Sequence, residues 1–243
     1  MGKETCAVVL AAGSGLRLGC TDIPKAMVAV GGKPILGYSL SILYESRFAP
    51  DSITVVVGAG KDVVTTYCAD SARICEQPLR DGNLSAIEAA LSGLPDRFTD
   101  LLIIHADDGL NLTQKVVSEL LHVHESQDMA VTLLLSHNFR SSAHRKQYLV
   151  DTHNRVVGSL PVGLQDGQVN VFTGVYCFDR QFFVEKARLV EKETERERTI
   201  TPILNVALRE NRLGAVIVDQ TWLGINTPTE LSVAKDRFWV KPS

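Results

Sequence analysis

The chain has 243 residues, 45% of them hydrophobic, and its 25 Lys and Arg side chains are matched by 28 Asp and Glu side chains. This length and apolar content suit a single α/β domain spanning residues 1–243. The net charge of −3 excludes the strongly basic surface that binds nucleic acid or anionic membranes, so we expect a small-molecule substrate.

Cysteine usage and hydropathy indicate a reducing, aqueous compartment. The five cysteines are scattered and include no C-x-x-C pair, which argues against a disulfide framework and against a zinc site. The apolar run at residues 7–12 is too short for the core of a signal peptide, and no run approaches the roughly 20 apolar residues that cross a bilayer. We therefore expect a cytoplasmic protein that has neither nucleic acid nor a membrane as its partner.

Predicted strands and helices alternate along the chain. Apolar runs typical of strands are Cys6–Ala12, Ser52–Gly58, Asp100–His105, Met129–Leu135, Val171–Phe178 and Leu213–Val218. Apolar residues at helical spacing occupy Ile35–Arg47, Ser85–Leu94, Gln114–Glu125 and Arg180–Lys192. This rhythm predicts an α/β, Rossmann-like fold: a mostly parallel mixed sheet flanked by helices, with a small antiparallel insertion at about residues 140–170.

A glycine-rich loop follows the first predicted strand. In this segment the missing side chains let backbone N–H groups approach a phosphate chain. Leu18 stands where a dinucleotide-binding G-x-G-x-x-G sequence needs glycine, and no Gly-Lys-Ser/Thr follows, so neither familiar phosphate loop is present. The predicted nucleotide-binding residues of the loop are Leu10, Ala11, Ala12, Gly13, Ser14 and Gly15.

Two cationic side chains follow this loop. Arg17 comes directly after it, and Lys25 comes after Pro24, which fixes the backbone where the chain turns back. Cations in such positions offset the charge that accumulates on a leaving pyrophosphate, the main electrostatic demand of nucleotidyl transfer. Arg17 and Lys25 are therefore the predicted catalytic residues.

These segments together resemble a known signature. Residues 11–18 (AAGSGLRL), Pro24-Lys25 and Gly32-Lys33-Pro34-Ile35 are similar to the motif of the nucleotidyltransferases that include the sugar-1-phosphate uridylyl-, thymidylyl- and guanylyltransferases. The small cytidylyltransferases carry the same pattern. The resemblance implies the GT-A-like fold of that family and a reaction that joins an NTP to a phosphorylated small molecule and releases pyrophosphate.

The resemblance also implies a segment that reads the base. Uridylyltransferases use a Gln and, five residues later, a Gly-Thr pair for the pyrimidine edge, and Gln77 and Gly82 fit this pattern. Asn83 replaces the Thr, which resembles the phosphocholine cytidylyltransferases. Gln77, Gly82, Asn83 and Ser85 are the expected nucleotide-binding residues, and a helix cap is the alternative role for Asn83.

A metal site is expected where the third predicted strand ends. The strand runs into Asp107 and Asp108, at the sheet edge where α/β proteins bind ligands, and oxygen ligands suit Mg²⁺. By resemblance, Asp107 is the family's metal-binding Asp and Asn226 supplies the second ligand. Mg²⁺ is therefore the expected cofactor, and Asp108 is expected to support Asp107.

The acceptor is less well specified by the sequence. The resemblance points to Tyr148, Thr173 and Gly174 as acceptor-binding residues, but Ser159–Gly163 lacks the Glu that holds sugar hydroxyls in sugar enzymes. A sugar 1-phosphate is the favoured acceptor, and a phosphocholine-like or phosphonate acceptor with CTP is the alternative. The charged run Glu191–Arg198 is predicted to be a solvated loop or helix end.

Two alternative functions belong to other classes of protein. A catalytically silent nucleotide-binding regulator is disfavoured because Arg17, Lys25, Asp107 and Asn226 are all present. A nicotinamide-dependent oxidoreductase fails at Leu18. The expected partners are an NTP and the phosphorylated acceptor, with a homo-oligomer as a further possibility.

Overall fold

A computed structural model describes residues 3–13, 15–19, 23–58, 60–79, 81–140, 145–161, 169–190 and 197–238, with backbone alone for 139–140. The strands are β1 Glu4–Leu10, β2 Ala29–Val30, β3 Lys33–Pro34, β4 Ile53–Val57, β5 Arg73–Glu76, β6 Phe98–His105, β7 Val131–Ser136, β8 Phe139–Arg140, β9 Gln147–Val150, β10 Val156–Leu160, β11 Asn170–Asp179, β12 Leu213–Val218 and β13 Trp222–Leu223. The α-helices are α1 Ile35–Glu45, α2 Lys61–Cys68, α3 Asn83–Leu91, α4 Gln114–Ser126, α5 Arg180–Ala187, α6 Thr201–Arg209 and α7 Pro228–Arg237.

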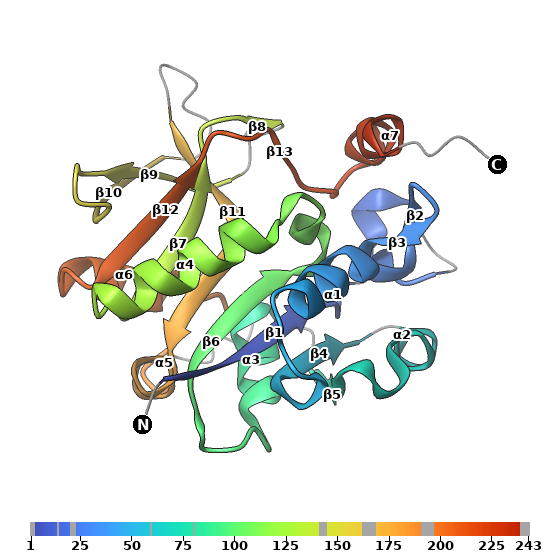
Figure 1. Cartoon of the computed structure of the whole chain (residues 1–243), viewed down its shortest axis with the longest axis horizontal. Coiled ribbons are helices and arrows are strands. Elements are labelled where there is room, and N and C mark those ends of the chain that lie inside the picture. Colours follow the sequence, from blue (N-terminus) through green and yellow to red (C-terminus); the bar gives the residue numbers. More distant parts are fainter. Residues whose placement is uncertain are drawn as a thin grey trace.

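One large mixed sheet organises these elements (Figure 1). Within the described residues it has nine strands, seven of them in the order β10-β9-β11-β6-β1-β4-β5, while β7 pairs with β11 and β12 pairs with β7. Pairing is parallel from β6 through β1 and β4 to β5, and again between β7 and β12. Strand β11 is antiparallel to β6, β7 and β9. The mixed, mostly parallel sheet predicted from the sequence is therefore confirmed.

Helices cover both faces of the sheet because successive residues of a buried strand point to opposite sides. Cys6 and Val8 of β1 pack toward α3, α5 and α6, whereas Ala7 and Val9 pack toward α1, α2 and α4. Helices α1 and α4 lie on the near face in Figure 1. Between these two apolar layers, the parallel strands β6, β1, β4 and β5 present their carboxyl ends at one edge of the sheet.

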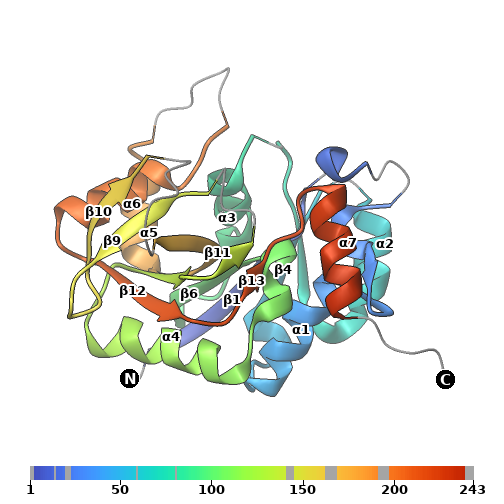
Figure 2. The ribbon, with the colours of Figure 1, turned by 90° about the horizontal axis from the view of Figure 1, so that it is seen from above.

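The predicted antiparallel insertion is also present. Strands β9 and β10 form a hairpin with a register shift between Val156 and Gly158, and β9 pairs with the start of β11. Figure 2 shows this hairpin at one end of the sheet and α7 at the other. The insertion therefore extends the sheet on the side away from α7.

A third apolar cluster joins the C-terminal segment to the loop that follows β1. Leu18 and Val28 from the early loops pack with Leu223, Ile225 and Ala234. Helix α7 consequently lies against β2 and against the short 3₁₀ helix η1, Leu16–Leu18. This cluster brings residues separated by about two hundred positions to the same edge of the sheet.

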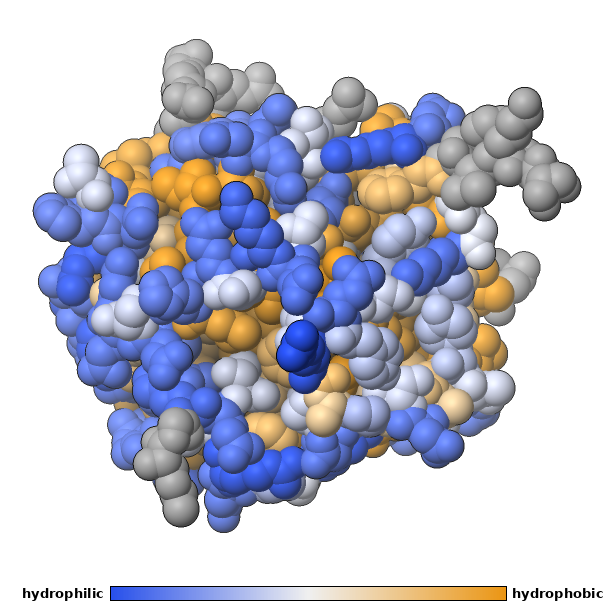
Figure 3. Space-filling model, in the orientation of Figure 1, coloured by the Kyte–Doolittle hydropathy of each residue, from blue (hydrophilic) through white to orange (hydrophobic). Residues whose placement is uncertain are grey.

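The surface is mainly polar on the face shown in Figure 3, where apolar side chains are scattered among hydrophilic ones. In the described part of the chain, no helix combines the length and the apolar character needed to span a bilayer.

Candidate active site

A cavity of about 460 Å³ opens at the carboxyl ends of β1, β5 and β6. In α/β sheets this edge is the usual place for ligands. Eleven of the residues predicted from the sequence lie in its wall: Leu10, Ala12, Gly13, Gly15, Arg17, Lys25, Gln77, Gly82, Asn83, Asp107 and Asn226. The wall also contains His105 and Glu197, to which the sequence analysis gave no role.

The glycine-rich loop forms one side of the cavity. Gly13 is exposed, and a Cβ added to it would meet no heavy atom within 4 Å. Gly15 has a φ of 71°, and a Cβ there would lie 3.2 Å from the Cβ of Lys25. The loop therefore leaves open space beside its backbone at Gly13 and lets Lys25 approach closely at Gly15. Ser14 lies outside the described residues.

Lys25 joins the two residues that were predicted to bind a metal. Its Nζ donates to Asp107 Oδ2 at 2.6 Å and to Asn226 Oδ1 at 2.9 Å. The side chains of Lys25 and Asp107 are 15% and 19% exposed, so water screens their attraction only in part. Beneath this cluster Ala11 lines a smaller cavity of about 60 Å³ together with Lys25 and Asp107.

Backbone contacts hold Asn226 beside Asp107. The N–H of Ile225 donates to the carbonyl of Asp107 at 3.2 Å. The N–H of Asn226 donates to Glu230 Oε2 at 2.7 Å, and Thr227 forms a capping box with Glu230 at the start of α7. Asn226 is therefore fixed by the N-terminus of α7.

Charge states differ sharply within the cluster. Burial alone would raise the pKa of Asp107, but Lys25 and the neighbouring positive groups outweigh it and lower that pKa to about 2. Burial lowers the pKa of His105 to about 4, and Arg145 and Lys25 reinforce this shift against Asp107. Near pH 7 Asp107 is thus ionised and His105 is neutral.

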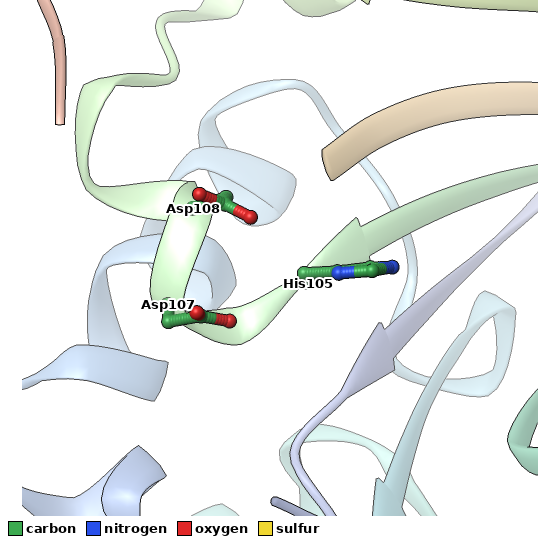
Figure 4. A group of neighbouring side chains, drawn as sticks. All are labelled: His105, Asp107 and Asp108. Atoms are coloured by element: carbon green, nitrogen blue, oxygen red, sulfur yellow. The ribbon is translucent and has the colours of Figure 1, made fainter. Parts of the chain in front are cut away.

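Asp108 lies beside this cluster but is engaged in an ion pair. His105, Asp107 and Asp108 offer ligand atoms within 4.8 Å of one another, and Figure 4 shows them at the end of β6 and in the following 3₁₀ helix η5, Ala106–Asn111. Both oxygens of Asp108 accept from Arg145, at 2.7 and 3.1 Å. Burial raises the pKa of Asp108 to about 7, but two accepting oxygens fit the ionised form. Asp107 is therefore the carboxylate left to face the cavity.

The residues present fit a divalent cation such as Mg²⁺. Asp107 offers an ionised carboxylate oxygen and Asn226 offers an amide oxygen, and both are ligand types that Mg²⁺ prefers. In the structure both oxygens already contact a single cationic group, the Lys25 ammonium. Two oxygens that can share one cation are suitably arranged to share another.

The predicted base-reading residues are held from two sides. Gln77 Nε2 donates to the carbonyl of Gly82 at 2.9 Å. Asn83 is the first residue of α3, and its Oδ1 accepts from the N–H of Ile200 at 3.1 Å, so it does not cap its own helix. Ser85 Oγ accepts a hydrogen bond from Arg198 Nη1 at 2.9 Å, so this hydroxyl is already engaged by another side chain.

The prediction of a solvated loop is wrong at Arg198, which is 8% exposed and bound to Glu88 and Ser85. Residues 191–196 lie outside the described residues. The partners of Arg198 are more than a hundred positions earlier in the chain. No local pattern could therefore have distinguished this arginine from its charged neighbours.

The predicted acceptor-binding residues lie away from the cavity wall. Thr173 is fully buried, and its hydroxyl donates to the carbonyl of Leu134 at 2.8 Å. Tyr148 is 4% exposed, and a methyl group on Gly174 would overlap Asp108 Oδ2. This geometry does not favour Thr173 or Tyr148 as groups that bind an acceptor, because neither polar group is presented to the cavity.

Comparisons with known proteins agree with the fold and indicate the family. The family model of the MobA-like NTP transferase domain matches residues 7–195. The bifunctional protein GlmU of Mycobacterium leprae is 27% identical over 249 residues, covering 94% of this chain and 49% of the relative. GlmU of Clostridium beijerinckii is 25% identical over 237 residues, covering 95% and 51%. The chain thus spans about half the length of these relatives.

A solved structure shares the fold. It is assigned as a glucose-1-phosphate thymidylyltransferase from Bacillus anthracis, solved in complex with a sucrose, and it matches with a TM-score of 0.77. The match covers 97% of this chain and 95% of that one at 16% sequence identity. At that identity the likeness concerns the fold alone.

Proposed function

The chain belongs to the MobA-like NTP transferase family, and from that premise we propose that it couples an NTP to a sugar 1-phosphate and releases pyrophosphate. The acceptor follows from the resemblance of the sequence to the sugar-1-phosphate nucleotidyltransferases. The base is a pyrimidine, because Gln77 and Gly82 follow the pattern of pyrimidine-reading enzymes.

The observation that carries the proposal is the contact of Lys25 with both Asp107 and Asn226. These residues come from three separate segments and meet in one cavity, beside a loop whose backbone is open at Gly13. A cationic side chain and an open glycine backbone suit a triphosphate, and an ionised carboxylate suits the divalent cation that accompanies it. A purely structural ion pair would not require the open loop.

The glycine-rich loop, Arg17 and Lys25 have different roles in the proposed reaction. Backbone N–H groups of the glycine-rich loop bind the phosphate chain, and Arg17, exposed at the rim, balances charge on the departing pyrophosphate. Lys25 stabilises charge at the phosphate under attack. The acceptor phosphate is already ionised near pH 7, so an in-line attack needs no general base from the protein.

Asp107 and Asn226 hold the Mg²⁺ in this scheme. When bound, the ion supplies a Lewis acid for the phosphate oxygens of the nucleotide. Neutral His105 lies beside these ligands and adds no charge that would repel a cation.

The proposal is tested by measuring pyrophosphate release with each of UTP, CTP, dTTP, GTP and ATP, in combination with several sugar 1-phosphates and with Mg²⁺. We expect turnover with at least one pair and its loss on chelation with EDTA. Asp107→Asn should lower turnover by about 10²-fold or more, whereas Asp51→Asn, at an exposed ion pair with Arg97, should leave it unchanged. Normal turnover in Asp107→Asn would remove Asp107 from the site, and inactivity with every pair would refute the transferase proposal.

A second candidate is a CTP-dependent transferase for a phosphocholine-like or phosphonate acceptor. It is favoured by the internal hydrogen bond of Thr173, which withdraws a group expected to hold sugar hydroxyls. The same assay distinguishes the two when phosphocholine and a phosphonate are added to the acceptor panel. Turnover with CTP and these acceptors alone would select the second candidate.

A further inference from the structure

A short segment lies across the loop that carries the predicted base-reading residues. We call Asp81–Ser85 the recognition loop and Glu197–Ile200 the strap. The N–H of Arg198 donates to the carbonyl of Asp81, and the carbonyl of Arg198 accepts from the N–H of Leu84 at 3.1 Å. These two backbone bonds join Arg198 of the strap to the recognition loop on both sides of Gly82 and Asn83.

Gly82 shows how closely the two segments approach. A Cβ at this position would overlap the backbone carbonyl of Arg198, and the residue has a φ of 126°. A side chain there would therefore push the strap away from the loop. The glycine is needed for this contact whether or not its backbone also faces a nucleotide.

The side chain of Arg198 fastens the strap to the helix behind the loop. Its guanidinium donates to both oxygens of Glu88 in α3, at 2.6 and 3.1 Å, and to Ser85 Oγ at 2.9 Å. Such paired, charge-assisted bonds define a geometry as well as a distance. Arg198 is 8% exposed and Glu88 is 36% exposed, so the pair is shielded from bulk water mainly on the arginine side.

The same contacts determine which polar atoms of Gln77 and Asn83 remain for a ligand. The N–H of Ile200 can only donate, so the atom of Asn83 that it contacts must be Oδ1, and the amide NH₂ remains. The carbonyl of Gly82 can only accept, so Gln77 uses its NH₂ there and keeps Oε1. Both side chains line the cavity. The atoms that these contacts leave for a ligand are therefore the donor NH₂ of Asn83 and the acceptor Oε1 of Gln77.

We infer that Arg198 is a positioning residue for base recognition: it holds the strap on the recognition loop, and the strap sets the orientation of Asn83 and the path of Gly82. The inference rests on the proposed function, since it assumes that this loop reads the base of an NTP. Its ligand class is the hydrogen-bonding edge of a nucleobase, which needs one donor and one acceptor in fixed positions. The phosphate-binding groups belong to other segments, so the effect of Arg198 is confined to the nucleotide's base.

The test compares Arg198→Met with Arg180→Met. Arg180 also clamps a loop, donating to the carbonyls of Pro95 and Phe98, but it does so at the amino end of β6, opposite the cavity. We expect Arg198→Met to raise KM for the preferred NTP by about 10-fold or more, with kcat changed by less than about threefold, and to reduce discrimination between bases. Hydrogen exchange of the Leu84 amide should accelerate in the same variant.

Arg180→Met should alter stability without changing KM or base discrimination. If Arg198→Met fails to fold, Glu88→Gln is tested in place of it. The Gln side chain at this partly exposed position can still accept a hydrogen bond from Arg198 but carries no charge, so we expect KM to rise by about threefold. Unchanged KM and unchanged discrimination in a folded variant would overturn the inference. Failure of the unmodified protein to bind any NTP would instead refute the proposed function.

Discussion

The contact of Lys25 with Asp107 and Asn226 predicts that this lysine competes with the metal for the same oxygens. At 2.6 Å and an effective dielectric constant near 20, the attraction between Lys25 and Asp107 is about 6 kcal/mol before the cost of desolvation. A charged hydrogen bond of this kind retains about 2 kcal/mol in net terms. Lys25→Met should therefore tighten the binding of a divalent cation to the nucleotide-free protein by about 30-fold.

This affinity can be measured independently of turnover with Mn²⁺, because the electron paramagnetic resonance signal of the free ion reports how much Mn²⁺ is unbound. Pyrophosphate release by the same variant should fall by about 10²-fold, because the charge on the phosphate loses its partner. Lys61→Met is the matched control, since Lys61 contacts Glu76 at 2.8 Å on an exposed surface. Mn²⁺ affinity that stays equal or weakens in Lys25→Met would refute the idea that the two oxygens form the cation site.

Two further variants separate binding from stability. Gly13→Ala should change the free energy of unfolding by less than about 0.5 kcal/mol relative to the unmodified protein, because a Cβ there meets no neighbour. The same variant should weaken NTP binding by about 10-fold, because the added methyl group occupies the space of the phosphate chain. Unchanged affinity in a calorimetric titration would contradict the role of the loop. Arg145→Met should cost about 3–5 kcal/mol in urea denaturation, because it leaves Asp108 buried without its partner. Arg145→Met combined with Asp108→Leu should recover much of that loss, and a single-variant cost below about 1 kcal/mol would contradict this account.

Periodicity was sufficient for the central elements of the fold. The buried strands β1, β4 and β6 were predicted because they are continuous apolar runs with helices between them. The edge strand β5 was missed because its four residues, Arg73–Glu76, begin and end with charges. Helix α2 was missed because eight residues with two adjacent valines and two adjacent threonines also suit a strand.

The site was predictable as far as strand ends and local motifs could indicate it. Asp107 follows a buried strand, and parallel strands present their ends at a common edge, so its position near the glycine-rich loop follows from the fold class. The ion pair of Asp108 with Arg145 could not be predicted, because it depends on a hairpin that returns to the sheet from another direction. When two side chains are brought together from distant parts of the chain, neither segment carries a periodic sequence pattern that reveals the contact.

The two sides of the cavity are held by different forces, and this difference makes their functions separable. Lys25 is fixed by charges that a metal and a triphosphate would also contact, so its position depends on what is bound. Arg198 is fixed by Glu88 and by the backbone of the recognition loop, which no ligand needs to displace. The first arrangement suits a group that must move with the phosphates during reaction, and the second suits one that must keep a base edge in register. Changes at Lys25 should consequently appear in kcat and in metal affinity, while changes at Arg198 should appear in KM and in the choice of base.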